Sequence, residues 1–130
     1  MDPLKCSEQL RKDPDVHYNC CQSVLMTFAE EMGLTEEEAY RLGANMGAGM
    51  RTGSACGVVT GALMVLGAMG YTEEESRAFL NEFTQAHGTG SLDCKDLLAW
   101  AKVRGLEKKP FCDGLVFHAV DFLDQLEPKG

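Results

Sequence analysis

The sequence predicts an all-α protein, a single-domain bundle of about six helices. Three observations lead to this class. Apolar residues recur at intervals of three and four along most of the chain. Runs of alternating β-branched residues between turn signals, which would indicate strands, are absent. Two Thr-Glu-Glu-Glu segments have the form of capping boxes that open helices. With 130 residues, the chain is expected to form one domain that buries a core without relying on disulfides.

The first two predicted helices lie on either side of Gly33. One begins after Asn19, a good N-cap residue, and ends where Gly33 supplies the left-handed cap. The other opens at Thr35, whose hydroxyl, together with the Glu38 carboxylate, satisfies backbone amides that the first turn leaves free. The apolar face of the first helix comprises Cys21, Val24, Leu25, Phe28 and Met32.

The third predicted helix begins at about Ser54, ends at Met69 and carries no charged residue. The uncharged stretch over residues 52–72 is long enough to span a bilayer. Its five glycines keep its hydrophobicity modest, so we expect a buried central helix of a bundle and no membrane insertion.

Turn and cap residues predict where the last three helices begin and end. Thr72 opens the fourth helix with the second capping box. The fifth begins near Ser91 and closes at Gly105. Pro110 suits the first position of the sixth helix, which ends before Pro128.

A weak internal repeat relates residues 32–38 (MGLTEEE) to residues 69–75 (MGYTEEE), a shift of 37 positions. Cys20 and Cys56 precede the two copies by 12 and 13 residues. One interpretation is a pair of pseudo-repeated helical hairpins, each with a cysteine at the same end of its first helix, followed by two C-terminal helices. The other is that the shared letters are only common helix punctuation.

Charge and cysteine content limit the classes of function that the protein could have. A formal net charge of −8 without a Lys/Arg stripe argues against binding to nucleic acid or an anionic membrane. The N-terminal residues lack the basic and apolar regions of a secretory signal, so we expect a cytoplasmic location, where cysteines stay as thiols or bind metal. Six cysteines are many for such a protein, and none forms a Cys-x-x-Cys pair.

Four of the six cysteines fall in the first turn of a predicted helix. They follow the expected cap or start residues Asn19, Ser54, Ser91 and Pro110 and are Cys20, Cys56, Cys94 and Cys112. A helix N-terminus favours a thiolate, which is both the nucleophile in disulfide exchange and the ligand in a metal site. A buried structural thiol is the alternative for any single cysteine. We expect Cys21 to be a core or auxiliary thiol and Cys6 to be incidental.

Glycines supply a second pattern, because Gly49, Gly53, Gly57 and Gly61 recur every four residues. On one helix they would form a flat groove for a neighbouring helix, or for a cofactor beside Cys56 that Gly53, Gly57 and Gly61 would contact. Close helix packing is the favoured use, and a homodimer through the same face is plausible. The sequence shows no Ser/His/Asp order, carboxylate pair or phosphate loop, so hydrolase and kinase functions have no support.

The cysteine and glycine segments together resemble the C_GCAxxG_C_C family of redox-active proteins. The resemblance covers about residues 18–126 and is carried by residues 19–25, 49–50, 53, 56–63, 94–98 and 112. It implies a small helical fold, a redox role and four hallmark cysteines, here Cys20, Cys56, Cys94 and Cys112. This chain departs from the pattern at Val58 and at Cys21, where alanine is usual, and Cys21 thereby adds a fifth thiol that could resolve a disulfide.

Three hypotheses of function remain open from the sequence. The first is a redox protein, whether thiol–disulfide oxidoreductase or electron-transfer component, whose helix-start thiols exchange with disulfides and which works with a redox partner protein. The second is a protein whose four hallmark cysteines bind an iron–sulfur cluster or another thiolate-bound metal. The third is a non-catalytic helical interaction protein. Convergence of the cysteines in space would favour either of the first two.

Overall fold

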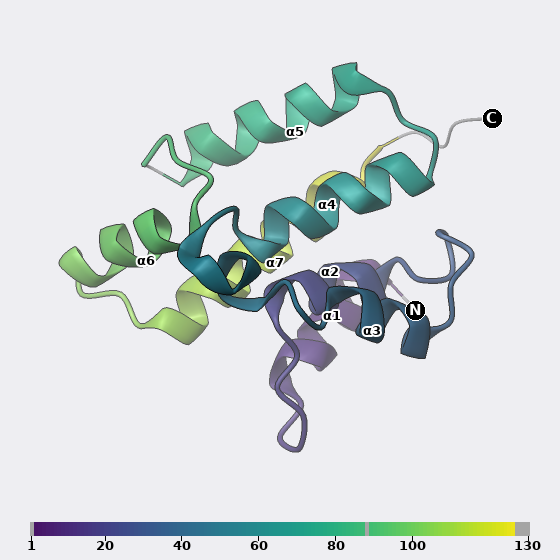
Figure 1. The fold of residues 1–130 in the computed structure, drawn as a ribbon, viewed down its shortest axis with the longest axis horizontal. Coiled ribbons are helices and arrows are strands. Elements are labelled where there is room, and N and C mark those ends of the chain that lie inside the picture. The colour runs from purple at the N-terminus through teal and green to yellow at the C-terminus, as the bar shows by residue number, and fades with distance from the viewer. Residues whose placement is uncertain (1, 88, 127–130) are drawn as a thin grey trace.

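A computed structural model describes residues 2–87 and 89–126 (Figure 1). Over these residues the chain forms seven α-helices and one short irregular turn, η1, and no strand. The all-α class is confirmed, with two elements more than the six that were predicted. The elements are α1 (Pro3–Lys12), α2 (Cys20–Thr27), α3 (Glu36–Gly43), η1 (Gly49–Gly53), α4 (Gly57–Ala68), α5 (Glu73–Ala86), α6 (Cys94–Val103) and α7 (Lys108–Asp124).

The two unpredicted elements are α1 and η1. Helix α1 has Pro3 at its start and packs against α7 and α2, where it buries Ser7 and Arg11. Because its buried residues are polar, α1 lacks the apolar stripe that identifies a helix in a sequence. In η1 the backbone is left-handed, so Gly49 and Gly53 do not lie on the helix that carries Gly57 and Gly61.

Several helix starts differ from those predicted. Helix α4 begins at Gly57 because an isolated antiparallel bridge between Ala55 and Asp93 occupies the preceding residues. Helix α6 begins at Cys94 with Asp93 as its N-cap residue. The hydroxyl of Ser91 accepts a hydrogen bond from the Asp93 amide and donates one to the Asp96 carboxylate.

Helices α2 and α7 also differ from the prediction in their limits. Helix α2 stops at Thr27, and turns rather than helix fill the residues up to Gly33. Helix α7 begins at Lys108, so Pro110 is its third residue and not its first. The predicted end at Pro128 lies outside the described residues.

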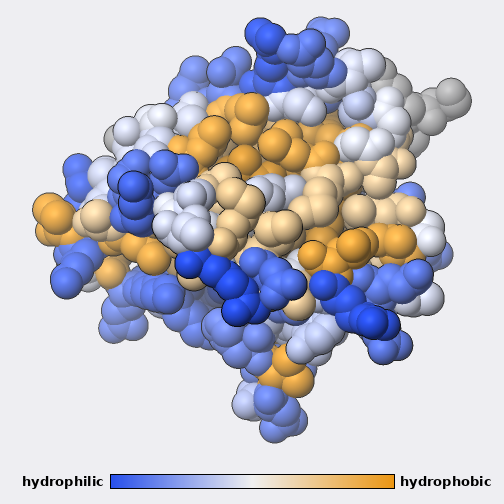
Figure 2. Space-filling view, in the orientation of Figure 1, coloured by the Kyte–Doolittle hydropathy of each residue, from blue (hydrophilic) through white to orange (hydrophobic). Residues whose placement is uncertain are grey.

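The core forms around α2 and α4, with α7 packed against both and α3 against α2. Helix α5 lies along one edge beside α4 (Figure 1) and inserts Phe79 and Phe83 into the core. On the face seen in Figure 2, apolar residues gather over α4 and α5, and hydrophilic residues border them on both sides. No helix in the described ranges is long and apolar enough to cross a membrane.

Glycines bring α2 and α4 into close parallel contact. A Cβ atom added at Gly57 would lie 2.9 Å from the Cys21 amide nitrogen, and one at Gly61 would lie 3.1 Å from the Val24 Cβ. Since both contacts advance along the two helices together, α2 and α4 start at the same end. The arrangement agrees with the interpretation of two hairpins, α2–α3 and α4–α5, in which both capping boxes are formed.

Candidate functional site

Four cysteines distant in the sequence line a single cavity of about 300 Å³. They are Cys20, Cys56, Cys94 and Cys112, the four hallmark cysteines of the sequence analysis. All four are free thiols, and Cys56 is the most deeply buried of them, with 4% of its surface exposed. The fold therefore brings together residues that are separated by as many as 92 positions (112−20).

The cavity lies where four helices begin. Cys20 is the first residue of α2, Cys56 is the N-cap residue of α4, and Cys94 is the first residue of α6. Cys112 is the fifth residue of α7 and lies in its second turn, because that helix starts two residues before Pro110. The first two residues of α7 also line the cavity, so the positive ends of four helix dipoles face one space.

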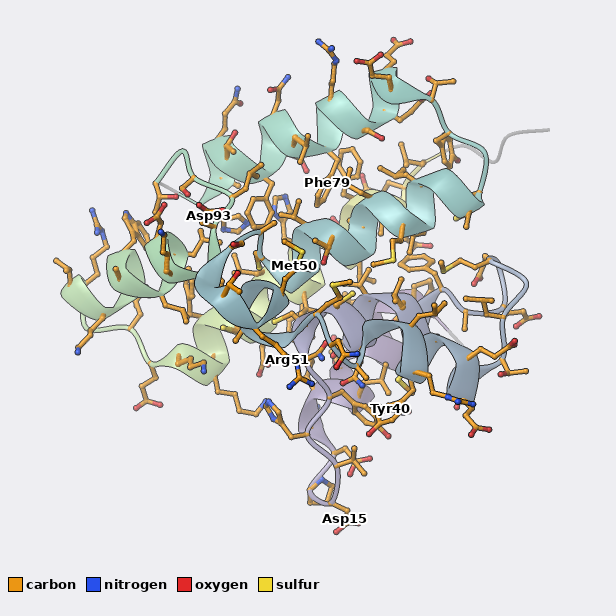
Figure 3. All side chains as sticks on the ribbon, in the orientation of Figure 1. Asp15, Tyr40, Met50, Arg51, Phe79 and Asp93 are labelled. Carbon is orange, nitrogen blue, oxygen red and sulfur yellow. The ribbon has the colours of Figure 1, made fainter. Side chains whose placement is uncertain are left out.

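The isolated bridge between Ala55 and Asp93 fixes two of the cysteines. The Cys56 amide donates to the Leu92 carbonyl, and the Cys94 amide donates to the Ser54 carbonyl, each at 2.8 Å. Because side chains alternate along extended backbone, Cys56 and Cys94 lie on the same face of this bridge as diagonal neighbours. Figure 3 shows Asp93 at the start of α6, beside the η1 turn.

A left-handed turn closes the cavity on the side of Cys94. Ala48, Gly49, Met50 and Arg51 all have positive φ, between 54° and 63°. The Ser54 amide closes the turn by donating to the Gly49 carbonyl at 2.9 Å. A Cβ atom at Gly49 would lie 2.3 Å from the Ser54 carbonyl oxygen and 2.8 Å from the Cys94 Cβ. Only glycine permits this approach.

Cys20 and Cys112 form a hydrogen-bonded pair with opposite shifts in acidity. The hydrogen bond from Cys20 lowers the pKa of Cys112 to about 7, and the positive charges of Arg11 and Lys108 act in the same direction. The same hydrogen bond, together with burial, raises the pKa of Cys20 well above its ordinary value. Cys20 is therefore the proton donor of the pair, and Cys112 is a thiolate over much of the neutral pH range.

Arg11 is a site residue that the sequence analysis missed. Its side chain is almost fully buried and bonds to the Asp113 carboxylate at 2.7 Å, the Tyr18 carbonyl at 2.9 Å and the Ser23 hydroxyl at 3.3 Å. Lys109 donates to the Arg11 carbonyl and to Asp113. No sequence signal connects Arg11 with Asp113, because their partnership depends on how α1 docks on α7.

The other two cavity thiols keep their protons. Burial, together with the neighbouring thiols Cys94 and Cys112, raises the pKa of Cys56 to about 11. The amides of Val58 and Val59 oppose this shift, although neither makes a side-chain cap bond of normal geometry. Burial and Cys112 also raise the pKa of Cys94, against the lowering effect of Lys108. A helix start therefore does not by itself produce a thiolate here, because desolvation outweighs it.

The remaining cysteines and glycines lie in different surroundings. Cys21 is fully buried in the core and does not line the cavity; burial raises its pKa, and a hydrogen bond with Thr60 opposes the rise. Cys6 lies in α1, away from the cavity. Gly57 lines the cavity, whereas Gly61 packs on α2 and Gly53 faces Lys95. The glycine face that suggested a homodimer is thus covered within the chain at Gly57 and Gly61.

Two further kinds of side chain were candidates for metal binding, the cysteines taken together and the histidines. In the described ranges no three or more His, Cys, Asp or Glu side chains are arranged to hold a metal ion. His17 lines the cavity. His87 and His118 lie outside the cavity lining and share a hydrogen bond with a length of 2.9 Å. His118 also contacts the Glu82 carboxylate at 2.9 Å. His118 is thus a satisfied histidine at the edge of the core.

Comparison with known proteins yields one match. The model of a family described as "Putative redox-active protein (C_GCAxxG_C_C)" matches residues 18–126. No curated protein and no solved structure matches the chain. The matched segment contains all four cavity cysteines and excludes α1.

Proposed function

Because the chain belongs to the C_GCAxxG_C_C family, we propose that it is a redox protein that works by thiol–disulfide exchange, with Cys112 as the attacking thiolate and Cys20 as the resolving thiol. One observation carries the proposal. Cys20 and Cys112 line the same cavity, and the interaction with Cys20 lowers the pKa of Cys112 to about 7, the value of an effective attacking thiol near neutral pH.

The proposed cycle transfers two electrons. The Cys112 thiolate attacks one sulfur of a substrate disulfide, forms a mixed disulfide and releases the first substrate thiolate. Cys20 then loses its proton, which the released thiolate or water accepts, and attacks the Cys112 sulfur. A Cys20–Cys112 disulfide forms and the second substrate thiolate leaves, so the two protein thiols are oxidised as the substrate disulfide is reduced. A dithiol reductant reverses the change in the protein.

Cys56 and Cys94 supply a second pair in this proposal. Their raised pKa values keep both thiols protonated and unreactive toward outside disulfides. Both lie next to the first pair, since each interacts electrostatically with Cys112. One of them can lose its proton and attack the Cys20–Cys112 disulfide, and the other then completes a Cys56–Cys94 disulfide. The two protons pass to Cys20 and Cys112, so two electrons move from the second pair to the first.

The proposed cycle also suggests a cellular compartment for the protein and a partner protein that reduces it. A dithiol that must be regenerated requires a supply of reducing equivalents, which the cytoplasm provides. We therefore place the protein in the cytoplasm and expect a thiol-bearing redox partner protein to reduce it. Binding of a metal by the four thiols is the competing function, and the arrangement of the described ligands does not favour it.

Trapping of the mixed disulfide tests the assignment of the two thiols. Cys20→Ser is expected to stop after the first step and to hold one substrate half on Cys112, as intact-protein mass spectrometry and peptide mapping would show. Wild-type protein is expected to lose two titratable thiols as it forms the Cys20–Cys112 disulfide. Cys6→Ser, a cysteine outside the cavity, is the matched control and should behave as wild type.

Two results would overturn the proposal. Unchanged reactivity in Cys112→Ser would remove Cys112 as the attacking thiol. Iron and acid-labile sulfide in protein purified without oxygen, with a visible absorbance that bleaches on reduction, would establish a cluster in place of thiol exchange.

A further inference from the structure

The charges around the cavity have the opposite sign to the charge of the whole protein. The protein carries a formal net charge of −8, yet Arg11, Lys108 and Lys109 line the cavity and no described aspartate or glutamate does. Asp113 lies behind them and binds Arg11 and Lys109. One carboxylate for three cations leaves the cavity with a positive excess.

Of these three cations, Lys108 is the one that could pair with a negatively charged ligand. It is exposed at the first position of α7, and within the described ranges it makes no ion pair. Its charge lowers the pKa of both Cys94 and Cys112, so it lies near the thiols. The positive ends of four helix dipoles act at the same place.

Besides the cations, the thiols, His17 and Asn19, the lining of the cavity is apolar, and the space is small. Leu97, Leu98, Leu115 and Met46 contribute to its walls. A volume of about 300 Å³ suits a small organic molecule and is at the lower end of the range for small-molecule sites. A short carbon chain would contact the apolar wall while a negatively charged group at its end reached Lys108.

We propose that the substrates are low-molecular-weight disulfides that carry carboxylate groups. This inference rests on the proposed function and names its substrate class. The apolar part of one substrate half lies against Leu97 and Leu115, its carboxylate lies near Lys108, and its sulfur receives the attack of Cys112. Two electrons pass from the Cys20 and Cys112 thiols to the substrate, which leaves as two thiols.

Three disulfides of similar length and different charge provide the test. They are 3,3′-dithiodipropionate, bis(2-hydroxyethyl) disulfide and cystamine, which are anionic, neutral and cationic at neutral pH. The second-order rate of mixed-disulfide formation on Cys112 is measured for each with the Cys20→Ser protein. The ratio of the anionic to the cationic rate is the readout, because the thiolate fraction of Cys112 enters both rates and cancels.

We expect the anionic disulfide to react roughly tenfold faster than the cationic one at low salt, and the ratio to shrink as salt is added. Lys108→Gln, added to the Cys20→Ser protein, should lower the ratio roughly threefold. Lys5→Gln is the matched control, because Lys5 is an exposed lysine outside the cavity lining and carries the same charge. It should leave the ratio unchanged.

The outcomes separate the inference from the function on which it rests. If none of the three disulfides modifies Cys112, the thiol-exchange function itself fails. If all three react at equal rates, or if cystamine reacts fastest as the net charge of the protein would favour, the charge-selective cavity is wrong while thiol exchange stands. A ratio that responds equally to Lys108→Gln and Lys5→Gln would also overturn the inference, since it would reflect overall charge.

Discussion

Cys112 and Cys20 differ in acidity because the Cys20 thiol donates a hydrogen bond to the Cys112 sulfur. A hydrogen bond to a thiolate stabilises the charged form, and the donor must stay protonated to make that bond. Arg11 and Lys108 add positive charge beside Cys112, and Asp113 only partly offsets it. The opposite pKa shifts of the two thiols thus follow from their surroundings rather than from their positions in the helices.

The first prediction is a pH dependence of Cys112 alkylation. Its rate with iodoacetamide should rise with pH and reach half its maximum near pH 7, the pKa of Cys112, because the thiolate is the reacting form. Cys20→Ala removes the donated hydrogen bond, so its inflection should move to higher pH and its rate at pH 7 should fall. Peptide mapping identifies the alkylated cysteine. A wild-type inflection at the ordinary thiol value of about 8.5 would contradict the assignment.

At the scale of elements, the cavity depends on how closely α2 and α4 approach. Gly57 and Gly61 let the α4 backbone lie against α2, which places the starts of both helices, and hence Cys20 and Cys56, side by side. A methyl group at either position must displace a neighbour. The close contact is therefore a requirement of the site and not only of the core.

The second prediction compares two glycines of the same helix. Gly57→Ala should lower the free energy of unfolding by about 1–3 kcal/mol, because the new methyl would meet the α2 backbone at Cys21. Gly67→Ala should raise it by about 0.5 kcal/mol, since a Cβ there meets nothing within 4 Å and alanine favours helix. Urea unfolding measures both. Equal effects of the two variants would show that helix propensity, and not the contact, controls stability here.

The third prediction concerns the left-handed turn of η1. Ala48 has a φ of 54°, a conformation that costs an L-residue about 1–2 kcal/mol and glycine nearly nothing. Ala48→Gly should therefore stabilise the fold by roughly 0.5 kcal/mol, once the greater flexibility of glycine in the unfolded chain is counted. Ala78→Gly, the same change at an exposed position inside α5, should destabilise it by about 0.5–1 kcal/mol. Chemical denaturation tests the opposite signs, and a loss of stability in both variants would refute the expectation.

Local sequence signals located most elements but not their limits. The capping boxes at Thr35 and Thr72 predicted α3 and α5 correctly, because such caps involve only four consecutive residues. The starts of α4 and α6 were misplaced, since the bridge between Ala55 and Asp93 joins segments that are 38 residues apart (93−55). Helix α1 was missed because its buried side chains are polar. Arg11, for example, bonds to Asp113 of α7, a contact that the sequence does not reveal.

At the scale of the whole molecule, α5 is attached through a small number of buried groups. Phe79 and Phe83 enter the core, and His87 at the end of the helix stacks on Phe83 and bonds to His118 of α7. Burial, together with the neighbouring His118, lowers the pKa of His87 from 6.5 to about 4. The docking of α5 therefore includes a histidine that must stay neutral.

The fourth prediction is a loss of stability in acid. Between pH 6.5 and about 4 the unfolded chain binds a proton at His87 that the folded protein does not bind. The contribution to the free energy of unfolding is thus zero above pH 6.5 and increasingly negative as pH falls toward 4. His87→Phe keeps a ring against Phe83 and cannot be protonated, so its Tm should fall less than that of wild type from pH 7 to pH 5.

The matched control for this experiment is His17→Gln, since His17 is exposed. It should show the same acid sensitivity as wild type. An equal fall of Tm in wild type and His87→Phe would mean that other groups control the acid response.

The cysteine set could be predicted from the sequence, but not its acidity. Spacing and resemblance singled out Cys20, Cys56, Cys94 and Cys112, and the fold places all four around one cavity. Their helix starts suggested four lowered pKa values, whereas only that of Cys112 is lowered. Burial and the hydrogen bond between two sulfurs decide the outcome, and both are tertiary properties that a linear pattern does not contain.

The left-handed turn beside the cavity also restricts which residues can replace its members during evolution. A β-branched side chain is strongly disfavoured at positive φ, whereas glycine, asparagine and aspartate are tolerated. Related sequences should therefore lack valine and isoleucine at the positions of Ala48, Met50 and Arg51, and should hold glycine at Gly49. The left-handed backbone of this turn would then be visible in related sequences as the absence of β-branched residues at these positions.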